Sequence, residues 1–409
     1  MPGLLPRRFF VDTAGMDLTG QKVCVIGAGI GGLTAALALR QRGAQVCVLE
    51  QAEAITEVGA GLQISPNGGA VLRALGLEAE VARRAVKAQA VELRDYAAGA
   101  MVSHLDLSLL KDQAPYLFLH RADLIDCLAA AVRASGVRVL LLQKVDSIVP
   151  AGEGHARPRV VIANGSEMKA DLVIGADGLH SRLRTALNGT VAPFFTRQVA
   201  WRATVPNTID HPNVARVHMG PRRHVVSYPL RAGALINIVA VQEQVGWAEE
   251  GWHIPDDPDN LRAVFADFGG TVTPMLAEVK DVRRWGLFRH PVAPVWQGGH
   301  CALLGDAAHP TLPFMAQGAV MAMEDAWVLV DALSRAETVA AGLASYQGRR
   351  EARVKRVVDT ASKNAWKYHL SNPVLRRAAH MGLRMASSVA PERMMGQFDW
   401  IYRHDVTQG

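Results

Sequence analysis

Near the N-terminus, two short apolar runs flank a longer segment in which apolar residues recur at helical spacing. Residues 21–29, QKVCVIGAG, predict a buried strand that runs into a glycine turn. Residues 30–43 predict a helix that ends at Gly43, and residues 44–50, AQVCVLE, predict the next strand. A strand, a helix and a strand in this order indicate a βαβ unit with parallel strands.

Two later apolar runs end where carboxylates and glycines begin. The segment ADLVIGADGLHSRLR, residues 170–184, contains a buried strand that ends at Asp177, and HCALLGD, residues 300–306, ends at Asp306. Parallel α/β sheets bind ligands at the carboxyl ends of their strands. We therefore expect these strand ends to meet the end of the first strand at one ligand-binding edge.

A different pattern occupies residues 200–245, where four strand-like runs follow one another as a meander: WRATVP, ARVHMG, RHVVSYPL and ALINIVAVQE. Side chains alternate between the two faces of a strand. His224, Val226 and Tyr228 in the third run therefore share one face. That face offers an imidazole and a phenol on either side of an apolar spacer.

Composition indicates a globular protein of about two domains, because the chain has 409 residues, 49% of them hydrophobic and 20% charged. The net charge of +6 is spread along the chain without a platform of basic and aromatic residues, so nucleic-acid binding is not expected. The longest uncharged run, residues 23–39, is short and glycine-rich, so no integral membrane span is expected.

Four cysteines lie in apolar segments and form no CxxC or zinc-ligand pattern, which favours buried thiols in a reducing cytoplasm and no metal site. Residues 1–15 lack the apolar core of a secretory signal. We interpret them as a loose tail, or as an upstream start before Met16.

The first βαβ unit carries a candidate dinucleotide site. Gly27, Gly29 and Gly32 have the GxGxxG spacing, which permits a tight turn, close approach of a pyrophosphate and close helix packing. The helix N-terminus would meet the phosphates. Glu50, followed by Gln51, stands at the end of the next strand, where a carboxylate can hydrogen-bond an adenosine ribose. The alternative is a glycine turn without a ligand.

A bound NAD would use only the first strand end, whereas all three suit FAD. GAGIGG, GADGLHSRLR and LLGDAAHPTLPFMAQGA resemble the three fingerprints of the group A flavoprotein aromatic hydroxylases, over roughly residues 20–365. The resemblance is to the salicylate hydroxylase, 3-hydroxybenzoate 6-hydroxylase and 6-hydroxynicotinate 3-monooxygenase branch. It implies an α/β protein (α+β overall). A Rossmann-like FAD-binding domain would hold an inserted, mainly antiparallel β-sheet substrate domain and be followed by C-terminal helices.

The third fingerprint implies most of the flavin contacts. By resemblance, Asp306 hydrogen-bonds a ribityl hydroxyl. Gly318 and Ala319 open a helix whose free N–H groups face N1 and the C2 carbonyl of the flavin, where the helix dipole favours negative charge. His309 lies inside this motif and is interpreted as a structural hydrogen-bonding residue, with a catalytic role as the alternative.

Three further residues are assigned to the cofactor by resemblance. Arg121 follows the apolar run YLFLH and matches an arginine that contacts the FAD phosphates, the alternative being a charge on a surface helix. Asp177 would serve the pyrophosphate region and the NAD(P)H route. Gln63 lies in a strand-and-helix region, residues 59–77, that passes near the flavin.

The resemblance also suggests substrate contacts. His224 and Tyr228 match a His/Tyr pair above the flavin, and the imidazole of His224 is the expected base for a substrate phenol. The alternative is a hydrogen-bonded sheet histidine and a core tyrosine. The sequence departs from the hydroxynicotinate enzyme at Gln63 and from the 3-hydroxybenzoate enzyme at Pro313. Neither enzyme's substrate can therefore be assigned to this protein from the resemblance. Arg202, Arg222 and Arg223 are the candidate partners of a substrate carboxylate.

The resulting hypothesis is a monooxygenase that uses FAD, transient NADH or NADPH, and O2 to hydroxylate a small phenolic or N-heteroaromatic acid through a flavin C4a-hydroperoxide. Three alternatives remain open: a hydroxylase or epoxidase of a larger substrate such as a quinone precursor or polyketide, a reductase of the same fold, and a flavin-binding sensor. The protein is expected to be a monomer or homodimer.

The predicted division of the chain follows from these motifs. Residues 20–190 form the first part of the FAD-binding domain, with an excursion to the substrate side near residues 85–115. Residues 191–289 form the substrate domain, and residues 290–365 complete the FAD-binding domain. Residues 366–409 form a helical tail that we expect to cap the flavin domain, with an interfacial membrane helix or a dimer contact as the alternatives.

Overall fold

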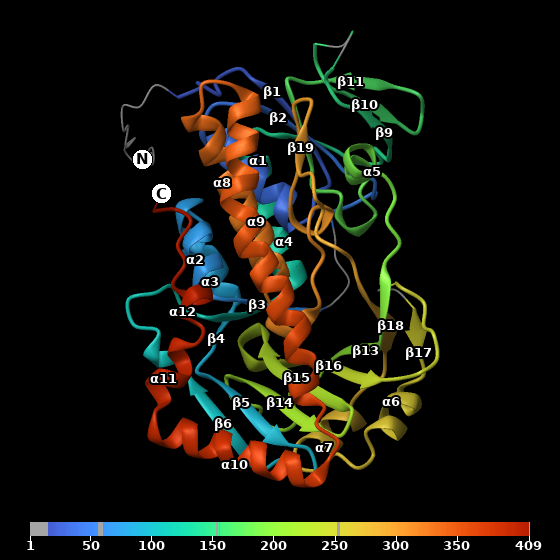
Figure 1. Ribbon diagram of the computed structural model, residues 1–409, viewed down its shortest axis with the longest axis vertical. Helices are drawn as coiled ribbons and strands as arrows, with labels where there is room; N and C mark the ends of the chain where they lie inside the picture. Colours follow the sequence, from blue (N-terminus) through green and yellow to red (C-terminus); the bar gives the residue numbers. More distant parts are fainter. Residues whose placement is uncertain (1–14, 56–59, 153, 155, 252–253, 409) are drawn as a thin grey trace.

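The computed structural model describes residues 15–55, 60–152, 154, 156–251 and 254–408 (Figure 1). Its first layer is a six-stranded sheet in the order β19-β20-β12-β1-β2-β8. The strands are β1 (Lys22–Ile26), β2 (Gln45–Leu49), β8 (Arg138–Leu140), β12 (Leu172–Gly175), β19 (Gln297–Gly298) and β20 (Cys301–Leu303). All neighbours are parallel except β19 and β20. The strand order places the ends of β12, β1 and β20 side by side.

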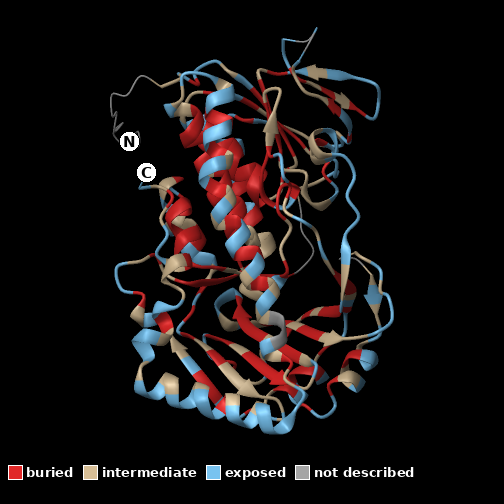
Figure 2. Cartoon of the chain, in the orientation of Figure 1, coloured by how far each residue is buried: buried red, intermediate tan, exposed pale blue. Residues whose placement is uncertain are grey.

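Apolar runs form this sheet because helices cover its strands, which leaves the central residues fully buried (Figure 2). Val25 in β1 lies beside Val48 of β2 and Ile174 of β12, and all three side chains are inaccessible to solvent. The covering helices include α1 (Ile30–Gln41), α4 (Arg121–Ala134), α8 (Gly318–Arg335) and α9 (Val339–Asn364). Helix α1 packs against both α4 and α8, and α8 packs against α9.

Short elements join this layer to the rest of the molecule. One three-stranded sheet has the order β3-β7-β4 and another has the order β11-β10-β9. Their bounds are β3 (Gly61–Ile64), β4 (Val86–Lys87), β7 (Leu117–His120), β9 (Val145–Val149), β10 (Arg159–Ile162) and β11 (Glu167–Lys169). The connecting helices are α2 (Pro66–Ala74), α3 (Glu78–Arg84), α5 (Arg182–Asn188), η1 (Leu107–Leu109), η2 (Gly178–His180), η3 (Arg231–Gly233), η4 (Gly305–Ala307), η5 (Pro313–Met315) and η6 (Ala365–Tyr368).

The second layer is an eight-stranded sheet in the order β17-β18-β13-β16-β15-β14-β5-β6. Its strands are β5 (Ala90–Asp95), β6 (Met101–Asp106), β13 (Phe194–Pro206), β14 (Val214–Gly220), β15 (Arg223–Leu230), β16 (Leu235–Glu243), β17 (Pro255–Asp256) and β18 (Val282–Arg289). All pairs are antiparallel except β14 with β5. The sheet therefore has the mainly antiparallel character that the meander pattern predicted.

One face of the eight-stranded sheet packs on α6 (Pro258–Val264) and α7 (Val272–Ala277) through a core that includes Val225, Phe265 and Met275. The opposite face is turned toward the six-stranded layer. Strands β5 and β6, from the excursion near residues 85–115, join this sheet rather than the first. The domain boundaries given above stay a prediction.

The helical tail consists of α10 (Pro373–Val389), α11 (Pro391–Gly396) and α12 (Asp399–Tyr402). The expectation that it caps the flavin domain is wrong for most of its length. Helices α10 and α11 pack on β6 of the eight-stranded sheet, and only α12 reaches α2 (Figure 1). The inward side of α10 includes the buried His380, which approaches Asp95 of β5. None of the helices among the described residues is long and apolar enough to cross a membrane.

Candidate active site

A cavity of about 640 Å³ separates the carboxyl edge of the six-stranded sheet from the open face of the eight-stranded sheet. Residues of both layers and of the tail line it. The first layer and its connections contribute Gly29, Gln63, Arg121, Asp306, Gly318 and Ala319; the second layer contributes Arg202, His224 and Tyr228; the tail contributes Trp400 and Tyr402. The cavity thus brings together most of the residues assigned from the sequence to cofactor and substrate.

The glycine turn after β1 leaves room for a ligand at one position only. Gly27 has a φ of 99°, and a Cβ there would lie 2.4 Å from the carbonyl oxygen of Ala176. A Cβ at Gly32 would lie 2.0 Å from the carbonyl oxygen of Gly27, so this glycine lets α1 pack against the turn. A Cβ at Gly29 would meet nothing within 4 Å, and Gly29 lines the cavity. This is the pattern that close approach of a pyrophosphate requires.

Glu50, at the end of β2, holds the turn in place. Its Oε2 accepts a hydrogen bond from the backbone N–H of Ala28 at 2.8 Å, and its Oε1 accepts one from the N–H of Ala52 at 2.9 Å. Neither Glu50 nor the exposed Gln51 lines the cavity. The carboxylate therefore orders the backbone beside the helix N-terminus, while a role of Glu50 and Gln51 toward a ribose stays a prediction.

The ends of β12 and β20 lie next to the glycine turn, as the strand pattern predicted. Asp177 follows β12, and its Oδ2 accepts a hydrogen bond from the N–H of Arg182 at 2.8 Å, so it orders the start of α5. Asp306 lies in η4, deep in the protein, yet its side chain is accessible because it faces the cavity. Burial in the protein interior raises the pKa of Asp306. Asp306 is thus positioned to accept a hydrogen bond from a ligand hydroxyl.

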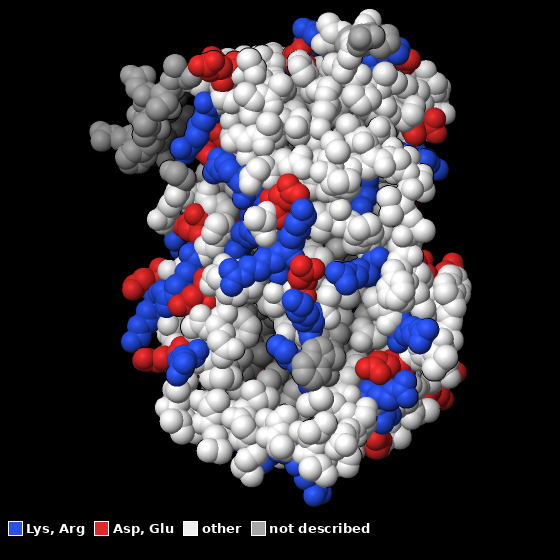
Figure 3. All heavy atoms as spheres, in the orientation of Figure 1, with Lys and Arg blue, Asp and Glu red and all other residues white. Residues whose placement is uncertain are grey.

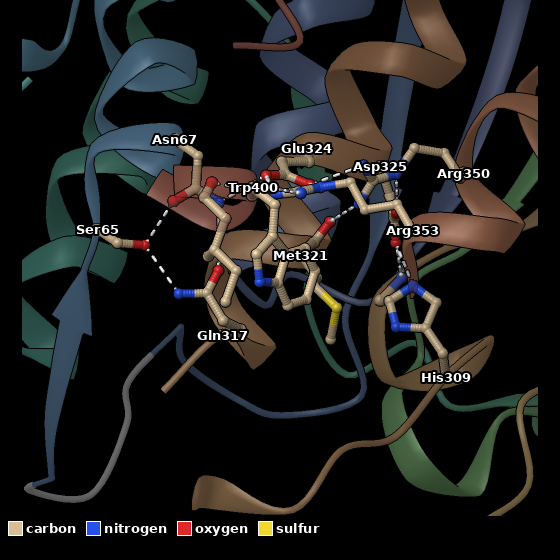
Figure 4. A network of polar contacts seen from close by, with 12 residues as sticks. Ser65, Asn67, His309, Gln317, Met321, Glu324, Asp325, Arg350, Arg353 and Trp400 are labelled. Atoms are coloured by element: carbon tan, nitrogen blue, oxygen red, sulfur yellow. Dashed lines mark hydrogen bonds and ion pairs between the residues drawn. The ribbon is translucent and has the colours of Figure 1, made fainter. Parts of the chain in front are cut away.

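The N-terminus of α8 opens onto the same cavity. The first N–H groups of a helix have no partner within the helix, and Gly318 and Ala319 are the first two residues of α8. The side chain of Gln317 does not cap them; it donates to the Oγ of Ser65 at 2.9 Å instead (Figure 4). The open helix end therefore presents N–H groups and a positive dipole to the cavity.

A buried ionic network anchors α8 behind this helix end (Figure 4). Arg350 of α9 forms ion pairs with Glu324 and Asp325, and Arg353 forms another with Glu324. Asn67 of α2 donates to Glu324 at 2.6 Å. Burial acts to raise the pKa of both carboxyl groups, but the neighbouring cations outweigh it and lower each pKa to about 2. Both carboxylates therefore stay ionised inside the protein.

His309 belongs to this network. Its Nε2 lies 2.5 Å from Oδ2 of Asp325, and the same oxygen accepts a hydrogen bond from the N–H of Gly305 at 2.9 Å. The imidazole is buried against Trp296 and does not line the cavity. The geometry agrees with the structural interpretation of His309, because Asp325 ties it to the loop that carries Asp306.

The substrate side of the cavity is the open face of the eight-stranded sheet. His224 and Tyr228 point to it from β15, since residues separated by two or four positions in a strand share a face. Arg202 lies on the neighbouring part of the face, from β13, and its guanidinium stacks over the Trp285 ring at 5.4 Å. Burial raises the pKa of Tyr228, with Arg202 acting in the opposite direction, so Tyr228 keeps its phenolic proton.

The other two candidate arginines lie elsewhere. Arg222 is exposed and pairs with Glu243, and Arg223 pairs with Asp267. Neither lines the cavity. Of the three candidates for a carboxylate partner, the structure therefore places only Arg202 at the cavity.

Sequence reasoning missed several aromatic residues of the cavity wall. Tyr116, which precedes β7, donates a hydrogen bond to Oε1 of Gln63 at 2.7 Å and contacts the ring of Tyr402 edge-on. Trp400 and Tyr402 come from the end of the tail. No local pattern marks these tyrosines and tryptophans as cavity residues, because their grouping depends on how the tail returns to the first layer.

These residues fit FAD. The open space at Gly29 and the guanidinium of Arg121 could hold the pyrophosphate, and Asp306 could bind a ribityl hydroxyl. The start of α8 at Gly318 could hold the pyrimidine end of the flavin ring. The fold and the site together define an α/β protein that binds FAD beside an antiparallel sheet.

Comparison with known proteins identifies the family. The FAD binding domain model matches residues 21–361. The chain is 33% identical over 395 residues to 3-amino-4-hydroxybenzoate 2-monooxygenase PtmB3 of Streptomyces platensis, covering 93% of this chain and 95% of that protein. It is 32% identical over 363 residues to 6-hydroxynicotinate 3-monooxygenase of Bordetella bronchiseptica, covering 86% and 93%.

A solved structure agrees with these relatives. Klebsiella pneumoniae HpxO, crystallised with FAD and uric acid, has a TM-score of 0.79 and 28% identity, over 90% of this chain and 94% of that one. The chain belongs to the FAD-binding family of aromatic hydroxylases and is a flavoprotein monooxygenase. The family, the fold class and the FAD cofactor predicted from the sequence are thereby confirmed.

Proposed function

We propose that this monooxygenase hydroxylates a small phenolic or N-heteroaromatic acid at the expense of NADH or NADPH and O2. One observation carries the proposal: His224, Tyr228 and Arg202 face the same cavity as the elements that fit FAD. A substrate held by this sheet face would lie directly opposite the start of α8.

Bound FAD supplies the redox chemistry, taking a hydride from the nicotinamide and delivering one oxygen atom from O2. The side chains supply the acid–base chemistry. His224 accepts the proton of a substrate hydroxyl, and the resulting phenolate has more electron density at the ring carbons ortho and para to its oxygen. Burial lowers the pKa of His224 well below its usual value, so its imidazole is neutral and available as a base.

Two residues orient the substrate in this proposal. Tyr228 remains protonated and donates a hydrogen bond to the substrate oxygen. Arg202 pairs with the substrate carboxylate, since a guanidinium matches the planar geometry of a carboxylate. Strand β16 lies between β13 and β15, and the register places Arg202 level with Val226, midway between His224 and Tyr228.

The walls of the cavity suit a small ring. Trp400 and Tyr402 of the tail and Tyr116 of the first layer contribute aromatic side chains to the cavity wall. Ligand pockets commonly measure about 300–1,000 Å³. The cavity of about 640 Å³ lies within this range, and beside a flavin ring it accommodates a small aromatic acid.

The relatives indicate which compounds to test first. Their names specify 3-amino-4-hydroxybenzoate and 6-hydroxynicotinate. Gln63, where the sequence differs from the hydroxynicotinate enzyme, and Pro313, where it differs from the 3-hydroxybenzoate enzyme, both line the cavity, so the panel must extend beyond those substrates. Cytoplasmic NAD(P)H and the buried free thiols of Cys24, Cys127 and Cys301 support a cytoplasmic enzyme, which we propose to be a monomer or homodimer.

The test is O2 uptake by the FAD-loaded protein with NADH or NADPH and a panel of hydroxybenzoates, aminohydroxybenzoates, hydroxynicotinates and larger phenols. We expect one small aromatic acid to stimulate uptake and to be recovered with one added hydroxyl group. Stimulation by larger phenols alone would contradict the substrate class. Oxidation of NAD(P)H without O2 uptake would contradict monooxygenation.

A further inference from the structure

The imidazole of His224 is the first member of a chain of side-chain hydrogen bonds that leads away from the cavity. Its Nδ1 lies 2.7 Å from Nε2 of His369, and Nδ1 of His369 lies 2.9 Å from Oε1 of Glu243. His369 is the residue after η6 and is 4% exposed, so it fills the interior between the cavity wall and the surface. Three side chains from β15, the tail and β16 therefore form one continuous path.

The path reaches solvent at Glu243. Its side chain is 31% exposed, and its Oε2 accepts a hydrogen bond from Arg222, whose side chain is 58% exposed. The other end of the path, His224, lines the cavity. The chain of hydrogen bonds thus connects the proposed substrate site with bulk water through the protein.

The charges along the path determine which nitrogen atoms carry protons. An ionised carboxylate only accepts hydrogen bonds, so Nδ1 of His369 is the donor to Glu243. Neutral His369 then has an unprotonated Nε2, which accepts from Nδ1–H of His224. Neutral His224 is left with an unprotonated Nε2. The surface carboxylate therefore selects, through His369, the tautomer in which His224 is a base.

Burial favours the neutral form of both rings. It lowers the pKa of His224, and His369 lowers it further. It also lowers the pKa of His369, against the opposing effect of Glu243. The ionisable groups near the two rings include Glu243, Arg222 beyond it, and Tyr368, whose ring lies 5.3 Å from that of His224. Arg202, Asp306 and Lys367 line the same cavity as His224. A proton taken up at His224 would therefore not rest there, because the path of hydrogen bonds ends at the carboxylate of Glu243.

We propose that His224, His369 and Glu243 form a proton relay that carries the hydroxyl proton of a bound phenol from the cavity to solvent. The proposal deepens the proposed function and rests on it. The phenolic O–H breaks as Nε2–H forms on His224, and Nδ1–H of His224 passes to Nε2 of His369. Nδ1–H of His369 then passes to Glu243 and from there to water. One proton leaves the substrate, one reaches solvent and no electrons are transferred.

The structural role of His369 belongs to its backbone, whereas the proposed relay uses its imidazole. The backbone of the same residue already fastens the tail to the sheet, since the N–H of Arg222 donates to the carbonyl oxygen of His369 at 3.1 Å. That bond does not need the imidazole. His369 acts through His224 and does not contact the substrate, so it is a positioning and relay residue rather than the base itself.

The relay is tested with FAD-loaded protein and the probe 4-hydroxy-3-nitrobenzoate, whose phenolate absorbs visible light. A stopped-flow jump from acid to neutral pH gives the rate at which the bound phenol loses its proton. We expect H369Q to slow this rate by at least about tenfold, since positioned acid–base groups commonly contribute roughly 100-fold or more. E243Q, which keeps a hydrogen-bond acceptor but removes the charge, should also slow it. Added imidazole should restore the rate of H369A, in which the truncated side chain leaves space for the free ring, and it would not do so after a packing defect.

H380Q is the matched control, because His380 is another buried tail histidine that approaches a carboxylate, Asp95, and lies outside the path. Its rate should equal that of the unsubstituted protein. Rates in H369Q and E243Q equal to that of the unsubstituted protein would overturn the relay, and so would a slow H369A that imidazole leaves slow. The pH jump measures deprotonation of the bound probe and needs no NAD(P)H. A protein that fails to hydroxylate any compound would contradict the proposed function, whereas the relay is judged only by the rate at which the probe loses its proton.

Discussion

The guanidinium of Arg350 lies 2.7 Å from the carboxylate of Asp325, and both side chains are fully buried between α8 and α9. Arg350 also pairs with Glu324. Removing one partner of a buried ion pair leaves an uncompensated charge and typically costs about 3–5 kcal/mol. We therefore expect R350M to lower the free energy of unfolding of the cofactor-free protein by about this amount, measured by urea denaturation.

Arg349 is the neighbouring control for that substitution. It is partly exposed and pairs with Asp331, which Arg335 also contacts. Asp331 is buried but keeps Arg335 as a partner when Arg349 is replaced. Ion pairs of solvent-accessible arginines contribute about 0–1 kcal/mol, so R349M should change the stability by no more than that. Equal losses in R349M and R350M would contradict the view that the buried network anchors α8.

The same network predicts a loss of stability in acid. The folded protein lowers the pKa of Glu324 and of Asp325 to about 2, from ordinary values of 4.5 and 3.8. Groups with a lowered folded pKa stabilise the protein above their unfolded pKa, and this contribution is lost as pH falls through the folded value. Unfolding followed by circular dichroism should show stability declining from about pH 4.5 toward pH 2. A double variant, E324Q/D325N, should show a shallower decline over this range.

Gly29 and Gly32 should respond differently to alanine. A methyl group at Gly32 would overlap the carbonyl oxygen of Gly27, and overpacking of this kind typically costs about 1–3 kcal/mol. A methyl group at Gly29 enters open space, so G29A should keep the stability of the cofactor-free protein but bind FAD more weakly. Urea denaturation and FAD titration separate the two effects. Unchanged FAD affinity in G29A would contradict the assignment of this space to the pyrophosphate.

Arg202 should control binding of an acidic substrate. A hydrogen bond to a charged group contributes about 1.5–3 kcal/mol, which corresponds to roughly 10–100-fold in affinity. We expect R202Q to raise KM for the carboxylate substrate within this range, with a smaller effect on its amide. R223Q is the control, since Arg223 lies in the same sheet, on β15, and pairs with Asp267 outside the cavity. Similar KM values for the acid in R202Q and the parent would rule out the carboxylate contact.

His224 should matter for hydroxylation more than for the cofactor. H224A removes the proposed base, and positioned bases contribute roughly 100-fold or more to rate. We expect kcat to fall by about that factor while FAD affinity stays near the parent value. The fraction of consumed O2 that appears as product measures coupling. If H224A has the same kcat and the same coupling as the unsubstituted protein, His224 is not the base of the reaction.

Local patterns were sufficient for the first layer of the fold. An apolar run, a glycine turn and a helix are neighbours in sequence, so the turn at Gly27 and the strand ends at Asp177 and Asp306 could be placed before their contacts were known. The same applies to His224 and Tyr228, whose shared face follows from strand alternation. Basic residues along α9 were likewise visible in the sequence, and Figure 3 shows them gathered over that helix.

Contacts between distant segments were not predictable in the same way. Glu324 and Asp325 lie inside an apolar stretch of sequence, but their partners Arg350 and Arg353 become adjacent only when α9 packs on α8. The tail was expected on the flavin layer, whereas α10 covers β6. Helical periodicity shows that a helix has an apolar side; it does not specify which surface that side contacts.

The sequence by itself determined the class of the protein, because backbone turns, strand alternation and glycine spacing act over a few residues. Only the tertiary structure decided which side chains lie behind His224. His369 is 145 positions from His224, and Glu243 reaches it from a third element. Hydrogen bonds between side chains depend on distances of a few ångströms in space, and packing of the whole chain sets those distances.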